Sequence, residues 1–219
     1  ANYVNQCRSM GIEVLPPDVN TSSIKFTTEN GAIRFALAAV KNVGQGALRE
    51  LIAERSENGP FSSYGDFLRR VAGSSLNRKM IESLIKSSAC DCFGVPRNQM
   101  LAVLSTYLDQ VTRARAEVMD GQLSFFDFGL QQKEPEEPDY PELPVLGLAQ
   151  LLEMEKETLG LYVTGHPLDP YEQVLRDLAT EGSSALHAAA PSIEGDYTLD
   201  RQQAHAAHEA RDGRQVVMA

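Results

Sequence analysis

Residues 36–52 read ALAAVKNVGQGALRELI, and this stretch decides the fold. Its pattern predicts a short helix over Ala36–Lys41 and a second helix over Gly46–Arg55. The apolar residues of the second helix share one face: Leu48, Leu51 and Ile52. Gly44 and Gly46 lie between the two segments and allow the chain to reverse sharply. The stretch therefore predicts a compact helix–turn–helix.

Residues 42–47, here called the glycine bend, have the features of a phosphate-binding turn. The first backbone N–H groups of a helix lack acceptors inside the helix, and the helix dipole attracts anions to them. Gly44 and Gly46 have no side chain that could block a phosphate, while Lys41 and Arg49 add positive charge nearby. Such contacts hold a nucleic-acid backbone without reading its bases. The alternative is a turn whose glycines only cap helices.

A second, degenerate copy of this arrangement follows. Two short helices over Leu68–Val71 and Arg78–Ile85 are joined by a turn with one glycine. Arg78 and Lys79 stand at the start of the second helix, where they can contact a phosphate. The arginines just before the turn have an alternative interpretation, in which they only solvate a helix face.

The other elements are predicted from local signals. Asn30-Gly31 between two alternating segments indicates a β-hairpin. Ser63 and Asn77 are typical helix N-caps, Gly11 is a natural C-terminal cap, and Gly160 follows the last predicted helix. The expected segments are helices over 1–10, 98–119 and 148–159, a helix after Ser63 with Phe67, Leu68 and Val71 among its apolar residues, and strands over 12–15, 24–28 and 32–35. Residues 120–145, rich in Glu, Pro and Asp, predict an exposed linker.

A short apolar peptide, Gln122-Leu123-Ser124-Phe125-Phe126, lies at the start of this linker. A segment that cannot fold alone has no core for large apolar side chains. Aromatic anchors that enter a partner's pocket often dominate the binding energy of a short peptide. The peptide is therefore predicted to bind a partner protein, and the alternative is that it packs back on its own domain.

Charge is distributed unevenly along the 219 residues, whose net charge is −10. Residues 31–97 hold ten Lys/Arg and six Asp/Glu, whereas residues 117–182 hold three and fifteen. This asymmetry predicts different partners for the two segments, although an ordinary solvated surface is an alternative. We find no charged-then-apolar leader and no apolar run long enough to span a membrane, so we expect a soluble cytosolic protein. The chain ends inside predicted elements, which indicates a piece of a larger protein.

Residues that could support catalysis or hold a metal are not found. Cys7, Cys90 and Cys92 do not make a disulfide framework, and we expect buried or inert thiols in a reducing compartment. The chain has no Gly-x-x-x-x-Gly-Lys-Ser/Thr loop, no Gly-x-Ser-x-Gly elbow and no Asp-x-Asp carboxylate pair. We therefore predict no catalytic residue, no metal site and no cofactor in this chain.

Several stretches, taken in order, resemble the C-family replicative DNA polymerases, the family of the bacterial DNA polymerase III alpha subunit. They are Cys7–Asn20, Ile33–Gly44, Leu76–Lys79, Ile81–Ala89, Glu155–Tyr162 and Gly165–Asp169. The resemblance covers about residues 1–178.

The resemblance implies a domain layout. It places the end of a fingers domain at 1–30, a tandem helix-hairpin-helix DNA-binding domain at 31–119, a clamp-binding peptide and acidic linker at 120–145, a connecting helix at 146–178, and a linker with the start of an OB-fold at 179–219. The peptide Gln122–Phe126 is similar to the family's clamp-binding pentapeptide, with Phe125 where the family usually has Leu. The catalytic aspartates of the family, which bind Mg²⁺ in the palm domain, lie upstream of this chain.

The resemblance also implies partners and a location. The partners are double-stranded DNA, the sliding clamp (beta subunit) and other polymerase III holoenzyme subunits, in the bacterial cytoplasm at the nucleoid and away from membranes. The fold expected is mainly α, with tandem helix-hairpin-helix motifs, a small β-hairpin on their N-terminal side, an extended linker and a C-terminal helix.

The sequence thus predicts the part of a replicative DNA polymerase that holds duplex DNA and tethers it to the sliding clamp. The residues predicted to bind DNA are Lys41, Gly44, Gly46, Arg49, Arg78 and Lys79. Two alternatives remain at this point: a non-catalytic adaptor whose hairpins bind protein, and a repair polymerase of the same family.

Overall fold

The computed structural model describes residues 2–119 and 137–171. The chain divides into two compact units, Ala1–Pro167 and Leu168–Ala219. The described part of the second unit contains one 3-10 turn, η3 (Asp169–Tyr171). Every other element described here belongs to the first unit.

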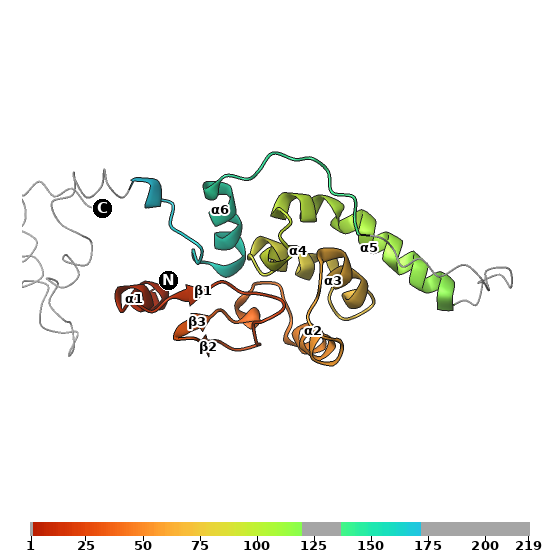
Figure 1. Ribbon diagram of the computed structural model, residues 1–219, viewed down its shortest axis with the longest axis horizontal. Coiled ribbons are helices and arrows are strands. Elements are labelled where there is room, and N and C mark those ends of the chain that lie inside the picture. The colour runs from red at the N-terminus through yellow and green to blue at the C-terminus, as the bar shows by residue number, and fades with distance from the viewer. Residues whose placement is uncertain (1, 120–136, 172–219) are drawn as a thin grey trace, which may run out of the picture. The chain divides into compact units, whose positions relative to one another are not determined.

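Helices make up most of the first unit, as the sequence predicts (Figure 1). The elements in chain order are α1 (Asn2–Ser9), β1 (Val14–Leu15), β2 (Thr27–Glu29), β3 (Ala32–Arg34), the 3-10 turn η1 (Leu37–Ala39), α2 (Gln45–Asn58), α3 (Tyr64–Val71), α4 (Arg78–Lys86), the 3-10 turn η2 (Asp91–Phe93), α5 (Arg97–Met119) and α6 (Leu148–Leu159). The mainly α class, with a small sheet near its N-terminal side, is confirmed.

The small sheet has the strand order β1-β3-β2. Strands β2 and β3 pair antiparallel through the turn at Asn30 and Gly31, whose φ angles are 50° and 85°. This is the predicted hairpin, and it forms because Asn and Gly tolerate positive φ. Strand β1 pairs parallel with β3, with Val14 opposite Ile33. The sequence predicted the strand but not its partner.

The predicted caps hold the helices at their expected ends. The Ser63 hydroxyl accepts a hydrogen bond from the N–H of Asp66, and the Asn77 side chain accepts one from Met80. Gly160, with φ of 77°, ends α6 in the left-handed conformation. Local chemistry therefore fixes these boundaries.

The predicted helix over Ala36–Lys41 is wrong in type, because the structure has only the 3-10 turn η1 there. The N–H groups of Leu37 and Ala38 donate to the carbonyls of Ser23 and Ile24. These bonds to a distant segment use donors at the start of the turn, and Val40 is already extended. One turn is therefore all that forms before the chain reaches the glycine bend.

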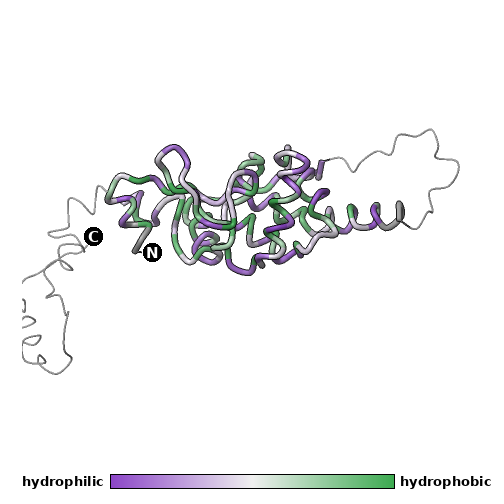
Figure 2. Tube along the Cα trace, turned by 90° about the horizontal axis from the view of Figure 1, so that it is seen from below, coloured by the Kyte–Doolittle hydropathy of each residue, from purple (hydrophilic) through white to green (hydrophobic). Residues whose placement is uncertain are grey.

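One core of buried side chains joins the helical segments η1, α2, α3 and α4 to α5. Helices α3 and α4 both pack on α5. Hydrophobic stretches, shown in green, run through the central part of the tube in Figure 2. The predicted inward faces are confirmed in their central positions. Fully buried side chains include Leu48, Leu51, Phe67, Leu68, Ile81, Leu84, Ile85 and Leu104.

Residues 137–147, here called the strap, cross over α5 to reach α6 (Figure 1). The expectation of an exposed linker is wrong at the beginning of the strap, because Pro138 is buried and Tyr140 packs against the core. The Glu137 carboxylate accepts hydrogen bonds from the Ser63 hydroxyl and from the N–H of Gly65, the latter at 3.2 Å. The N-terminus of α3 therefore binds an anion supplied by the chain itself.

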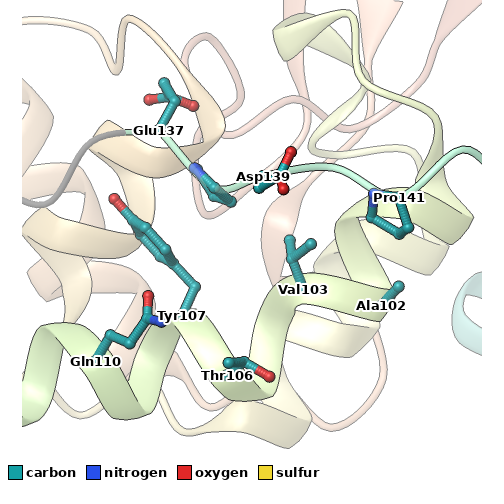
Figure 3. A pocket seen from close by; sticks show the side chains of 9 residues that line it. Ala102, Val103, Thr106, Tyr107, Gln110, Glu137, Asp139 and Pro141 are labelled. Carbon is teal, nitrogen blue, oxygen red and sulfur yellow. The ribbon is translucent and has the colours of Figure 1, made fainter.

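A cavity of about 560 Å³ lies between the strap and α5. Figure 3 shows Val103 and Tyr107 of α5 pointing towards the strap, which carries Glu137 and Asp139. The strap is thus held mainly at its points of attachment rather than by close packing along its length.

We expect Glu137→Ala to lower the free energy of unfolding by about 0.5–1 kcal/mol, because an anion is lost from a helix N-terminus. A Cβ at Gly65 would lie 2.8 Å from the carboxyl carbon of Glu137, so Gly65→Ala should already displace that carboxylate. In the Gly65→Ala background, Glu137→Ala should then have almost no effect. Thermal or urea unfolding of the two single variants and the double variant gives this coupling. Additive effects would contradict the proposed contact.

Candidate nucleic-acid interface

The glycine bend lies open at the N-terminus of α2. Gly44 is the N-cap, and Gly44, Gln45 and Gly46 are all exposed. The first N–H of this turn with an acceptor is that of Leu48, which donates to the Gly44 carbonyl. Among the described residues, none accepts a hydrogen bond from the N–H groups of residues 45–47. A Cβ added at Gly46 would meet no atom within 4 Å, so the bend can accept an anion from outside.

The N-terminus of α4 lies beside the glycine bend. A Cβ at Gly44 would be 3.6 Å from the terminal methyl of Met80, in the first turn of α4. The Asn42 side-chain amide is 3.5 Å from the Ser83 hydroxyl, also in α4. The Met80 side chain and Ser83 therefore connect α4 to the glycine bend.

The predicted cationic residues differ in their surroundings. Arg49 and Lys79 are exposed, and no ion pair involving either is found in the described part of the chain. Arg78 pairs with Glu82 at 3.3 Å and donates to the Ser105 hydroxyl at 2.6 Å. Both partners of Arg78 are partly exposed, so its ion pair is weak and easily exchanged.

Lys41 does not point to an open site. Its Nζ donates to the Glu157 carbonyl at 3.0 Å, at the C-terminal end of α6. Its backbone N–H donates to the Thr158 carbonyl at 2.9 Å. Lys41 therefore contacts a helix C-terminus, which is a favourable place for a cation.

The turn of the second hairpin is occupied by the protein's own side chains. The Glu50 carboxylate accepts hydrogen bonds from the N–H and the hydroxyl of Ser75, at 2.7 and 2.5 Å. The Ser75 hydroxyl lowers the pKa of Glu50 below its usual value. Arg115 donates to the Ala72 carbonyl and approaches Gly73. An external phosphate thus meets a carboxylate at this turn, whereas the glycine bend is open.

The two arginines before that turn brace the fold rather than merely solvate a helix face. Arg70 pairs with Glu54 at 2.9 Å and lies 4.3 Å from the centre of the Phe61 ring. Arg69 donates to the Tyr107 hydroxyl at 2.9 Å. Both alternatives considered from sequence, phosphate contact and simple solvation, fail to describe these side chains.

A buried ion-pair network links α6 to the start of α5 and to η2. Glu155 is 0% exposed and Arg97 is 5% exposed, and their side chains approach to 3.3 Å. Arg97 also pairs with Asp91 at 2.6 Å. The Glu155 carboxylate accepts further hydrogen bonds from the N–H groups of Val163 and Thr164 and from the Thr164 hydroxyl. Sequence reasoning missed this network, although an acid on the apolar face of α6, three residues after Leu152, was a usable signal.

The thiols of Cys90 and Cys92 are poor nucleophiles. Cys90 is buried and its pKa is raised by burial, and burial raises the pKa of Cys92 to about 12. In residues 2–119 and 137–171, no group of three or more His, Cys, Asp or Glu could hold a metal ion. In the same residues no helix is long and apolar enough to cross a membrane. The peptide Gln122–Phe126 and the predicted OB-fold start lie outside the described residues.

This chain is similar to a known protein family and to known proteins. Residues 11–100 match the family described as "Helix-hairpin-helix motif", which agrees with the paired short helices and the glycine bend. The chain is 41% identical over 180 residues to the DNA polymerase III subunit alpha of Thermus aquaticus, covering 82% of this chain and 14% of that protein. It is 37% identical over 204 residues to the same subunit of Bacillus subtilis (strain 168), covering 91% of this chain and 17% of that protein.

The chain therefore belongs to the family of the DNA polymerase III alpha subunit. It spans about one seventh to one sixth of the length of these relatives, 14% of the Thermus protein and 17% of the Bacillus protein. The predicted resemblance is confirmed, and the match includes the residues around the glycine bend.

Proposed function

We propose that this chain holds the backbone of duplex DNA at the glycine bend, as part of a protein that performs template-directed DNA synthesis. The observation that carries the proposal is the exposed N-terminus of α2 at the glycine bend, where the N–H groups of residues 45–47 have no acceptor among the described residues. These free N–H groups, together with the exposed cations Arg49 and Lys79 and the exchangeable Arg78, suit a phosphate group. None of these groups reads a base edge, so the grip would be independent of sequence.

The catalytic role belongs to the whole protein. A nucleotidyl-transfer site needs carboxylates that hold Mg²⁺ ions at the reacting oxygens. We propose that these lie elsewhere in the parent chain and that the residues described here only keep the product duplex aligned. The proposed location of this protein is the cytoplasm at the nucleoid, with other polymerase III holoenzyme subunits as partners.

Salt dependence tests the DNA proposal. Each phosphate neutralised by the protein releases counterions, so log K should fall with log salt by a slope of about −0.9 per contact. We expect a steep slope in a fluorescence anisotropy titration of a labelled duplex, and the same slope for unrelated base sequences. A shallow slope, or binding to one sequence alone, would favour the alternative in which the hairpins bind protein.

We also propose that Gln122–Phe126 tethers the chain to a sliding clamp. Its support is the apolar composition of the peptide within an acidic segment and its similarity to the family's pentapeptide. Anchors of this kind contribute about 2 kcal/mol or more, so Phe126→Ala should weaken binding at least ~30-fold. A 120–129 peptide titrated against the clamp by calorimetry gives the affinity, with a scrambled peptide as control. Equal affinities would reject the tether and favour a repair polymerase of the same family.

A further inference from the structure

The last turn of α6 is attached to the residue that precedes the glycine bend. Lys41 uses both its backbone N–H and its Nζ in this contact, towards the carbonyls of Thr158 and Glu157. Gly160 adds to the fit, because a Cβ there would lie 3.7 Å from the Lys41 Nζ. The contact spans 116 residues of sequence. It joins the bend to a helix that lies outside the helix-hairpin-helix match at residues 11–100.

The same turn of α6 also holds the second hairpin. Both oxygens of the Glu157 carboxylate accept hydrogen bonds from the Nζ of Lys86, at 2.9 and 3.0 Å. Lys86 is the last residue of α4, the helix whose other end lies beside the glycine bend. Glu157 therefore contacts one lysine from each hairpin, through its carbonyl and through its carboxylate. Both hairpins are therefore attached to the same residue of α6.

Electrostatics favours this place for the Lys41 ammonium. The carbonyls at the C-terminus of α6 carry the negative end of the helix dipole, and the Glu157 carboxylate is close by. A phosphate at the glycine bend would have to draw Nζ away from that negative site. Arg49 and Lys79 have no such competing partner in the described residues.

We propose that Lys41 is a positioning residue: it fastens the glycine bend to α6 and does not itself neutralise a phosphate. This inference rests on the proposed DNA grip. It makes α6 a structural part of that grip and gives Lys41 a role different from that of Lys79. Loss of the Lys41 ammonium keeps the backbone hydrogen bond to Thr158 but should loosen the attachment of the bend to α6, without removing a phosphate contact.

Salt dependence separates the two roles because it counts neutralised phosphates. The full-length protein is titrated with a labelled duplex at several salt concentrations, as wild type, Lys41→Ala, Lys41→Arg and Lys79→Ala. Lys41→Ala should reduce affinity about threefold at every salt concentration with an unchanged slope. Lys41→Arg, which can still donate to the Glu157 carbonyl, should restore affinity. Lys79→Ala should make the slope shallower by about 0.9.

Hydrogen exchange provides the second measurement. Amides of residues 42–47 should exchange faster in Lys41→Ala and at the wild-type rate in Lys79→Ala, with thermal unfolding confirming that both variants are folded. A slope that becomes shallower in Lys41→Ala, or unchanged affinity and exchange, would overturn the positioning role. A shallow wild-type slope, with no effect of Lys79→Ala, would instead reject the DNA grip itself, so the two failures are distinguishable.

Discussion

Replacing Glu155 with alanine is expected to lower the free energy of unfolding by about 3–5 kcal/mol. The carboxylate is fully buried and accepts hydrogen bonds from Arg97, Thr164 and Val163. Its removal leaves the Arg97 guanidinium, itself 5% exposed, without one of its anionic partners. It also leaves the buried N–H of Val163 without its acceptor, which lowers the free energy of unfolding further. Urea unfolding followed by circular dichroism measures the change.

Glu153 provides the matched control, since it lies on the same helix with an exposed carboxylate. Glu153→Ala should change stability by no more than about 0.5 kcal/mol. Glu155→Gln should fall between the two, because its amide keeps one acceptor oxygen but places a donor against other donors. A Glu155→Ala variant as stable as Glu153→Ala would show that the network contributes little to stability.

Gly46→Leu is expected to reduce affinity for duplex DNA at least ~10-fold while leaving the fold as stable as before or slightly more stable. Gly46 lies in the first turn of α2 with open space around it, so the new side chain meets no protein atom at its Cβ. Replacing a helical glycine usually stabilises a helix by about 0.5–1 kcal/mol. The leucine would cover the N–H donors, and losing even one charge-assisted hydrogen bond costs about 1.5–3 kcal/mol.

Ala53→Leu gives a control on the same helix, because Ala53 is also exposed but lies two turns away from the glycine bend. It should leave DNA affinity unchanged. Anisotropy titrations of both variants with two duplexes of different sequence complete the test. If Gly46→Leu bound both duplexes as wild type does, or lost only one of them, the glycine bend would not be the phosphate site.

Local signals made much of the fold predictable. Ser63 and Asn77 act as N-caps, and Asn30-Gly31 forms the hairpin turn, because each depends on residues two to four positions away. The glycine bend was predicted for the same reason, and the structure adds that it is exposed. Whether its donors bind DNA stays a prediction.

Long-range contacts account for what sequence reasoning missed. Arg97 meets Glu155 across 58 residues, and Lys41 meets Glu157 across 116 residues. No spacing rule connects such positions, so Lys41 was grouped with the phosphate contacts on proximity in sequence alone. The helix predicted at Ala36–Lys41 failed for a related reason, because hydrogen bonds to Ser23 and Ile24 override local propensity there.

The open N-terminus of α2 at the glycine bend has a consequence for movement along DNA. In the proposed complex, backbone amides meet a phosphate, and every nucleotide offers an equivalent phosphate at a regular interval. Advancing the helix by one step would break and remake identical bonds, so all registers have equal energy. The Glu50 carboxylate beside Ser75 keeps the neighbouring turn from adding a further hold. In the proposed complex, a few interchangeable hydrogen bonds of this kind would let the DNA duplex slide along its axis while its orientation is kept.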